Sequence, residues 1–210
     1  MANLQIILST GNSSKAEQIK PIFAGLPIEV LTLKEVGILN RAQEIDGSSM
    51  EINSRIKARF AWEQLKHKTW TMADDTGLKI RALGGRPGVD AATWAGKDAS
   101  LEEIMNFTLE QMKRQTDRTA EWETCAVLIS PEGDEYIFKG ACPGKLLEAP
   151  RCKPQKDMPY SAIFVPDGYD EVWAQMPVEK ENTISHRGKA FGQVRQFLIE
   201  HLNLTEKASP

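Results

Sequence analysis

Strand-like and helix-like segments alternate along this chain of 210 residues, without a strict repeat and without a low-complexity linker. Short apolar runs predict strands, whereas apolar residues at helical spacing predict amphipathic helices. In the first half of the chain these patterns predict strands at 4–9, 28–33 and 69–73, and helices that start at Ser13 or Ser14, at 50–65 and at 101–112. We therefore expect an α/β fold.

The second half of the chain predicts an antiparallel region. Two strands, at 121–130 and 135–141, are expected on either side of a suitable hairpin connection, Pro131-Glu132-Gly133-Asp134. A third short strand is expected at 160–165, and Ser185 is a candidate N-cap for a closing helix that runs to about Leu202. These strands suggest a lobe at about 119–165 within a single domain that spans 1–210.

The composition narrows the class of protein. The formal net charge is −3, whereas a nucleic-acid binder more often carries a basic surplus, so no nucleic-acid partner is expected. Three cysteines without a C-x-x-C pair fit reduced thiols, and three scattered histidines do not suggest a zinc site. The sequence shows no signal-peptide pattern and no apolar run near the about 20 residues of a membrane span. We therefore expect a cytoplasmic protein without a membrane partner.

The segment Ser9-Thr10-Gly11-Asn12-Ser13-Ser14-Lys15 lies between a predicted strand and a predicted helix. Small and hydroxylated residues let backbone N–H groups approach an anion, and Lys15 would supply a full positive charge for a phosphate. The spacing of a Walker loop is absent. Read alone, an ordinary capped strand-to-helix turn is the stronger interpretation.

Two adjacent acids, Asp74 and Asp75, are expected where the strand at 69–73 ends. Adjacent carboxylates repel, so two of them in one cleft need a cation or a shifted pKa. Side chains of a strand alternate between its faces, but a turn expected at Gly77 would let both acids reach one site. Magnesium favours one or two carboxylates with phosphate oxygens and water, and Glu44 is a further candidate acid. A solvated Asp-Asp turn is an equal alternative.

The run Ser185-His186-Arg187-Gly188-Lys189 lies at the expected start of the last helix. Its donors and positive charge suit a phosphate or the keto oxygen of a base, and a helix cap with solvated basic residues is an equal alternative. Together, an anion-binding turn, an acid pair and a donor cluster favour phosphoryl chemistry more strongly than any one of them does. A Ser–His triad is not supported, because the chain has no Gly-x-Ser-x-Gly elbow.

Several motifs make the chain similar, over nearly its whole length, to the inosine/xanthosine triphosphate pyrophosphatase family. In chain order they are Thr10-Gly11-Asn12 with Lys15, Asn53 with Lys57-Ala58, Ala73-Asp74-Asp75-Thr76-Gly77-Leu78, Ala82-Leu83-Gly84-Gly85 with Pro87-Gly88, Ala95-Gly96, and Ser185-His186-Arg187-Gly188-Lys189-Ala190. The resemblance implies an elongated mixed sheet with a long central cleft between two lobes, and a homodimer. It also implies Mg²⁺-dependent hydrolysis of ITP, dITP or XTP to the monophosphate and pyrophosphate, which would cleanse the nucleotide pool.

The resemblance also assigns roles by position. Thr10, Asn12 and Lys15 would hold the triphosphate, and Lys15 would also serve catalysis. Asp75 would activate the attacking water, although the sequence leaves open which of the two aspartates is the base. Magnesium would be bound by Glu44 and Asp74. The nucleotide pocket would be lined by Tyr160, Lys180, Ser185, His186 and Arg187.

The chain departs from the family pattern where the base would be read. A run that is usually Gly-Phe-Gly, then Tyr or Trp, then Asp-Pro has Met158, Pro159, Ser161 and Ala162 in place of its Phe, second Gly, Asp and Pro. Met158 lacks an aromatic face, and Ser161 cannot carry an anionic acceptor. Our hypothesis is that hydrolysis is retained while base selectivity is loosened or redirected to another nucleoside triphosphate. Neutral drift in this loop, and a nucleotide-binding protein that has lost turnover, are the alternatives.

Overall fold

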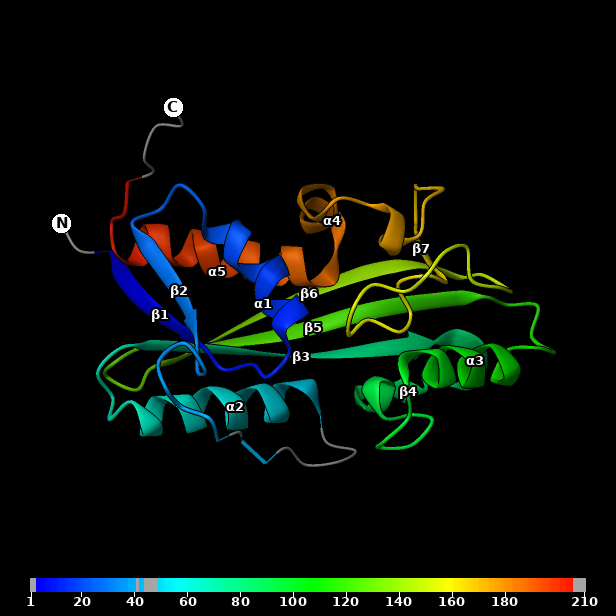
Figure 1. Ribbon diagram of the computed structural model, residues 1–210. Helices are drawn as coiled ribbons and strands as arrows, with labels where there is room; N and C mark the ends of the chain where they lie inside the picture. Colours follow the sequence, from blue (N-terminus) through cyan, green and yellow to red (C-terminus); the bar gives the residue numbers. More distant parts are fainter. Residues whose placement is uncertain (1–2, 41, 44–48, 206–210) are drawn as a thin grey trace.

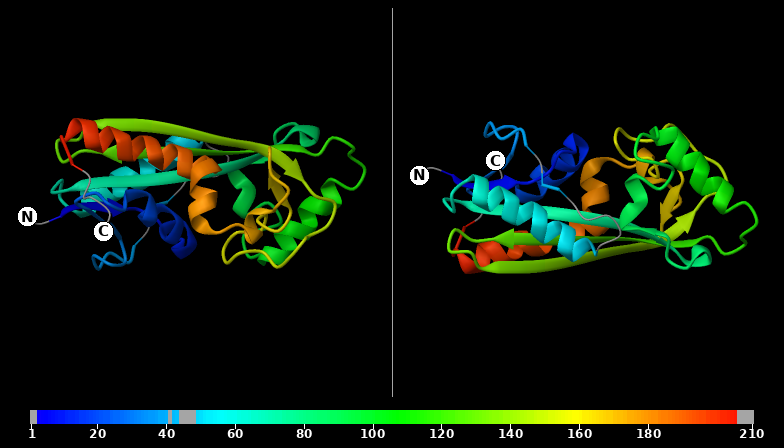
Figure 2. Two further views of the ribbon diagram at one scale, coloured as in Figure 1. Left: turned by 90° about the horizontal axis from the view of Figure 1, so that it is seen from above. Right: turned by 90° about the horizontal axis from the view of Figure 1, so that it is seen from below.

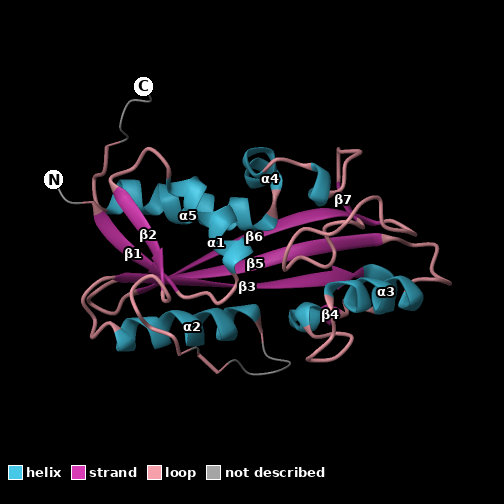
Figure 3. Ribbon diagram, in the orientation of Figure 1, coloured by secondary structure: helices cyan, strands magenta, loops and turns pink. Residues whose placement is uncertain are grey.

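The computed structural model describes residues 3–40, 42–43 and 49–205. This part of the chain forms one seven-stranded sheet in the order β2-β1-β3-β5-β6-β7, with β4 paired to β3 off this path. The strands are β1 (Leu4–Leu8), β2 (Ile28–Thr32), β3 (Trp70–Ile80), β4 (Pro87–Gly88), β5 (Thr119–Ile129), β6 (Glu135–Leu146) and β7 (Phe164–Pro166). The helices that flank them (Figure 3) are α1 (Ser13–Ile19), α2 (Met50–Gln64), α3 (Leu101–Gln111), α4 (Val178–Ile184) and α5 (His186–His201).

The direction of the strands makes this a mixed sheet. β1 pairs in parallel with β2 and β3, whereas each pair along β3, β5, β6 and β7 is antiparallel. The three longest strands, β3, β5 and β6, run along the molecule and make it elongated (Figure 2). Helices α1, α4 and α5 lie over one face of the sheet, and α2 and α3 lie over the other (Figure 1). The predicted α/β fold with an elongated mixed sheet is confirmed.

The strand predicted at 69–73 is longer than expected. β3 continues from Trp70 to Ile80, because β5 pairs with it residue by residue from Thr71 to Ile80. The prediction that this strand ends before the two aspartates was therefore wrong, since Asp74 and Asp75 lie in its middle. Gly77 is also within β3, opposite Glu123, and makes no turn.

Two further predictions need correction. The strand expected at 160–165 is reduced to β7, and Tyr160 lies in the turn before it. Helix α2 has nearly the predicted range. The helical spacing of Ile52, Ile56, Ala61 and Leu65 predicts its apolar face, but Ile52 is 47% exposed. The buried face of α2 carries Ala61, as predicted, together with Ala58, because small side chains let a helix approach the sheet closely.

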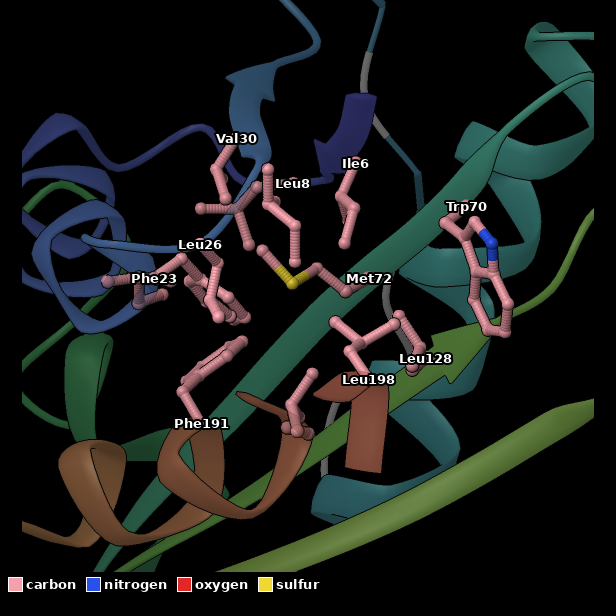
Figure 4. Packing of buried hydrophobic residues seen from close by; sticks show 14 of the residues in the cluster. Ile6, Leu8, Phe23, Leu26, Val30, Trp70, Met72, Leu128, Phe191 and Leu198 are labelled. Atoms are coloured by element: carbon pink, nitrogen blue, oxygen red, sulfur yellow. The ribbon is translucent and has the colours of Figure 1, made fainter. Parts of the chain in front are cut away.

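Two hydrophobic clusters fill the two ends of the molecule. The first joins β1, β2 and α5, and Figure 4 shows Leu8, Met72 and Phe191 meeting in it. The second contains Leu78 and extends as far as Met176. Because β3 contributes Met72 to one cluster and Leu78 to the other, the intervening polar residues stand at the junction of two cores. The division into lobes stays a prediction, but the second cluster draws on a wider span than 119–165.

The cysteines are buried or half-buried thiols. Cys125, Cys142 and Cys152 are all free of disulfide bonds. Burial raises the pKa of Cys125 and of Cys142 to about 11, so both stay protonated at neutral pH. No helix in the described part of the chain is long and apolar enough to span a membrane.

Candidate active site

One edge of β3 is open at its centre. β5 occupies the other edge throughout, β1 pairs with β3 at Trp70–Met72, and β4 pairs with it at Leu78 and Lys79. Between these two contacts, residues 73–77 have no strand partner on this edge among the described residues. Neighbouring side chains of a strand point to opposite faces, but around an open edge both faces are accessible from one side. Asp74 and Asp75 therefore reach a common cavity without the turn that the sequence suggested.

Gly77 is required by packing. A Cβ atom added at this position would lie 2.9 Å from the backbone oxygen of Gly88. Gly77 thus lets β4 approach β3 and close the open edge at its far end.

The cavity has a volume of about 710 Å³, within the range of small-molecule sites. The turn after β1 and the two aspartates form its charged end. Its other walls come from the segment 89–93, the start of α3, the loop 157–161 and the first residues of α5. The predicted site residues that line it are Thr10, Asn12, Lys15, Asp74, Asp75, Tyr160, His186 and Arg187.

The turn after β1 presents Lys15 to Asp74. The Asn12 side chain caps α1 by accepting a hydrogen bond from the Lys15 backbone N–H at 3.0 Å, and Thr10 Oγ1 accepts one from the Asn12 N–H at 3.2 Å. The Lys15 ammonium lies 2.9 Å from Asp74 Oδ2. The capped turn and the cationic contact expected here therefore coexist, because the cap holds the backbone from which Lys15 extends.

Asp74 is a buried but ionised carboxylate. Burial alone would raise its pKa, but Lys15, Arg187 and Lys57 hold the pKa well below its usual range. Arg187 Nε lies 3.6 Å from Asp74 Oδ2, and Thr76 donates a hydrogen bond to the same oxygen at 3.1 Å. The second oxygen, Oδ1, is buried and has no hydrogen-bond partner among the described residues.

Asp75 has a second set of partners on the opposite face of β3. The Lys57 ammonium lies 2.9 Å from Asp75 Oδ1, and the Asn53 amide donates to Oδ2 at 3.4 Å. Both partners come from α2 and line the cavity. The sequence motifs include Asn53 and Lys57 but do not predict their role, although their spacing of four places them on one face of a helix.

The residues at 180–187 divide between the cavity and the surrounding packing. Ser185 caps α5, as predicted, by accepting a hydrogen bond from the Gly188 N–H at 3.0 Å, and it does not line the cavity. Lys180 also lies off the cavity lining: it pairs with Glu171 and lies over the ring of Tyr169. His186 lines the cavity, and burial, with Arg187 nearby, lowers its pKa well below the usual value. His186 is therefore neutral at physiological pH.

Aromatic rings line the end of the cavity away from the lysines. The His186 ring stacks on Trp122 with centroids 5.3 Å apart, and Trp173 lies 5.0 Å from it. Both tryptophans belong to the second hydrophobic cluster and line the cavity. The Tyr160 hydroxyl donates to the Ala91 carbonyl at 2.8 Å, which ties the loop 157–161 to the opposite wall.

The acids present fit a divalent cation that takes most of its ligands from elsewhere. In the described part of the chain no group of three or more His, Cys, Asp or Glu side chains is placed to hold a metal, and Glu44 lies outside that part. Mg²⁺ is usually held by one or two carboxylates together with phosphate oxygens and water. The unpartnered Oδ1 of Asp74 is a suitable oxygen for such an ion.

Two buried residues in the site were not anticipated. The Gln18 amide donates a hydrogen bond to Glu181 Oε1 at 2.7 Å, and Gln18 Oε1 accepts one from Arg187. Glu181 lines the cavity in the place where Lys180 was expected. No sequence motif marked either residue. Glu181 differs from the adjacent Lys180 in the side of α4 on which it lies, and the sequence did not predict which side faces the cavity.

The fold and the cavity define an α/β protein with a central cleft that is cationic and acidic at one end and aromatic at the other. The chain belongs to the Ham1 family, whose model matches residues 6–197. It is 34% identical to the dITP/XTP pyrophosphatase of Caldanaerobacter subterraneus subsp. tengcongensis, over 95% of this chain and 98% of the relative. The enzyme of the same name from Christiangramia forsetii is 32% identical, over 93% and 99% of the two chains.

Solved structures agree with this assignment. A HAM1 protein from Coxiella burnetii superimposes with a TM-score of 0.80 at 30% identity, covering 94% of this chain and 99% of the other. The Ham1 protein of Staphylococcus aureus gives a TM-score of 0.79 at 28% identity, with the same coverage. The family resemblance seen in the sequence motifs is thereby confirmed.

Proposed function

We propose that this protein is a nucleoside triphosphate pyrophosphatase that hydrolyses deaminated purine nucleotides, ITP, dITP and XTP, to the monophosphate and pyrophosphate. The observation that carries the proposal is the arrangement of two lysine–aspartate pairs, Lys15–Asp74 and Lys57–Asp75, around the open edge of β3. The names of the curated relatives, dITP/XTP pyrophosphatase, support the same substrate class.

The triphosphate would lie at the charged end of the cavity. Lys15 and Lys57 provide two cations there, with Thr10 and Asn12 on the adjacent turn. The base would lie among Trp122, Trp173, Tyr160 and His186 at the other end, where apolar and aromatic surface is available for stacking.

Hydrolysis requires a base, a cation for the leaving group and a metal ion. Asp75 accepts a proton from the water that attacks the α-phosphorus, and Lys57 and Asn53 hold the carboxylate in place. The bond from the α-phosphorus to the bridging oxygen breaks, and Lys15 offsets the charge on the departing pyrophosphate. Asp74, with Glu44 as the second acid, would hold Mg²⁺, which when bound neutralises phosphate charge.

The protein would discriminate against adenine by the group that the purine carries at C6. Hypoxanthine and xanthine carry a keto acceptor at C6, whereas adenine carries an amino donor there. Donors directed at this position would be left unpaired by adenine, at a cost on the order of 1–3 kcal/mol per group. We assign this contribution to His186 and Arg187, the polar residues at the start of α5.

An altered base specificity is the second candidate, favoured by the loop 157–161. Met158, Pro159 and Ser161 all line the cavity, so the departures from the family pattern fall in the wall of the site. The Ser161 hydroxyl is engaged within its own loop, accepting from the Gln155 N–H and donating to the Met158 carbonyl, both at 2.7 Å. It therefore stabilises the loop and is not available to replace an acid that reads the base.

We further propose that the protein is a cytoplasmic homodimer that cleanses the nucleotide pool and has no nucleic-acid or membrane partner. These statements rest on the resemblance to the family and on the sequence. Sedimentation of the purified chain would test the dimer directly.

A substrate panel tests the function. The purified protein with Mg²⁺ is expected to release pyrophosphate, and no orthophosphate, from ITP, dITP and XTP faster than from ATP or UTP. Asp75→Asn is the matched inactive control. A parent protein that binds ITP without releasing pyrophosphate would support the binding-protein alternative, and fast hydrolysis of another nucleotide would support the altered specificity.

A further inference from the structure

A buried carboxyl group in the cavity wall is only half satisfied. Glu181 in α4 is 2% exposed, and its Oε1 accepts the hydrogen bond from Gln18. Its other oxygen, Oε2, is buried and has no hydrogen-bond partner in the part of the chain that the structure describes. An unpaired buried carboxylate oxygen is costly unless a ligand brings a donor.

Glu181 lies between the charged end and the aromatic end of the cavity. Gln18 links it to Arg187, which in turn contacts Asp74. On its other side lies Gln155, whose amide donates to the Trp173 carbonyl at 3.3 Å. A nucleotide with its phosphates at Lys15 and its base near Trp173 would therefore pass its base beside Glu181.

A hydrogen-bond donor on a ligand would change the ionisation of the Glu181 carboxyl group. Burial raises the pKa of Glu181 above its usual value, and Arg187, Gln155 and Gln18 offset only part of this effect. A ligand N–H group that hydrogen-bonds to the carboxylate would favour the ionised form.

We infer that Glu181 determines base specificity by reading the N1 and C2 edge of a 6-oxopurine, one carboxylate oxygen accepting from N1–H and the other facing the group at C2. This inference rests on the proposed function and extends its second candidate, the altered base specificity, because a residue that reads N1–H and C2 would select among the 6-oxopurines, guanine included. Glu181 makes no contact with the reacting phosphates in this assignment.

The chemistry of the bases then sets an order of preference. Hypoxanthine and guanine present N1–H, with hydrogen or an amino donor at C2, so a carboxylate accepts one or two hydrogen bonds from them. Xanthine presents N1–H but an oxo group at C2, whose lone pairs oppose the second carboxylate oxygen. Adenine presents a lone pair at N1. The expected order is therefore ITP and GTP above XTP, with ATP last.

The test compares ITP with XTP, which differ at C2 and in the hydrogen that the 2-oxo base carries at N3. For the parent protein kcat/KM should favour ITP by about tenfold. Glu181→Gln should move the XTP to ITP ratio toward XTP by about tenfold or more, because the new amide N–H can donate to the oxo group while the amide oxygen still accepts from N1–H. Glu179→Gln, an exposed change two residues away on α4, should leave the ratio unchanged.

Binding of the product monophosphates separates this inference from the proposed function. The affinities of IMP and XMP, measured by calorimetry, report on base recognition even when nothing is hydrolysed. A chain without pyrophosphatase activity that still prefers IMP would refute the function and keep the inference. A parent protein that binds XMP as tightly as IMP, or a folded Glu181→Gln variant with an unchanged preference, would overturn it.

Discussion

The Lys57 ammonium lies 2.9 Å from Asp75 Oδ1, on the opposite face of β3 from the Lys15 ammonium, which lies 2.9 Å from Asp74 Oδ2. Adjacent positions of one strand thus carry two ion pairs, one held by α2 and the other by α1. The two aspartates have different surroundings, because Arg187 joins the Asp74 pair while Asn53 joins the Asp75 pair. This difference allows their roles to be separated by substitution.

Asp75→Asn should abolish turnover while leaving nucleotide binding intact. Loss of a general base typically lowers kcat by about 10²- to 10⁴-fold, and the amide keeps the shape of the carboxylate. The measurement is single-turnover pyrophosphate release at saturating ITP, beside the affinity for the product monophosphate. A variant that retains more than a tenth of the parent rate would exclude Asp75 as the base.

Asp74→Asn should instead act through the metal ion. Because Asp74 offers its unpartnered Oδ1, replacing it should raise the Mg²⁺ concentration needed for half-maximal activity, with partial recovery at high Mg²⁺. Chelation of divalent ions should abolish the activity of the parent. A Mg²⁺ titration of both asparagine variants distinguishes them, and equal shifts for the two would contradict the assignment.

Lys15→Met should destabilise the protein in a pH-dependent way. Removing one partner of a buried ion pair costs about 3–5 kcal/mol, and we expect about 2–3 kcal/mol here because Arg187 remains near Asp74. The lowered pKa of Asp74 contributes stability that is present above its unfolded value, near 3.8, and is lost as the pH falls through the folded value. The deficit of the variant in urea unfolding should therefore shrink as the pH falls below about 4. A deficit that does not change with pH would show that Asp74 is not the cause.

His186 should make the protein less stable below about pH 6.5. Burial holds His186 neutral in the folded state, whereas in the unfolded chain it takes up a proton near its ordinary pKa. The unfolded state thus binds more protons, and the free energy of unfolding falls as the pH decreases. Between pH 7.5 and 5.5 the free energy of unfolding of the parent should fall by about 1.4 kcal/mol more than that of His186→Phe, because all other groups titrate alike in the two proteins. Equal losses in urea unfolding would mean that His186 is protonated in the folded protein.

Local patterns in the sequence predicted much of the site. The strand, turn and helix at 4–19 and the cap at Ser185 follow from short-range chemistry, and the structure has them where they were expected. Together they place Lys15 and Arg187 at the ends of helices that meet the sheet. The sequence also predicted Asp74 and Asp75 as site residues, but it did not predict that they lie in the middle of a strand.

The missed features depend on contacts between distant segments. β3 runs through the aspartates because β5, some 50 residues later, pairs with it, and no signal within 70–80 records that partner. The sequence also did not predict which side chains of α4 face inward, for a similar reason. Its contact with α5 at Gly188 turns Glu181 inward and Lys180 outward, and that contact joins two separate helices.

Gly188 and Gly192 offer a test of this contact, because they lie one turn apart in α5 and differ only in their surroundings. A Cβ atom added at Gly188 would lie 1.9 Å from the backbone oxygen of Asn182 in α4, whereas one added at Gly192 would meet nothing within 4 Å. Gly192→Ala should therefore stabilise the protein by about 0.5–1 kcal/mol, since alanine favours the helix.

Gly188→Ala should destabilise it by about 1–3 kcal/mol, because α4 must move away from α5. That movement would also shift Glu181 relative to Arg187, so the variant should lose activity toward ITP even where it remains folded. Thermal unfolding and kcat/KM measured on both variants check this pair of outcomes. If Gly188→Ala were as stable and as active as Gly192→Ala, the close packing of the two helices would not be what positions the base end of the cavity.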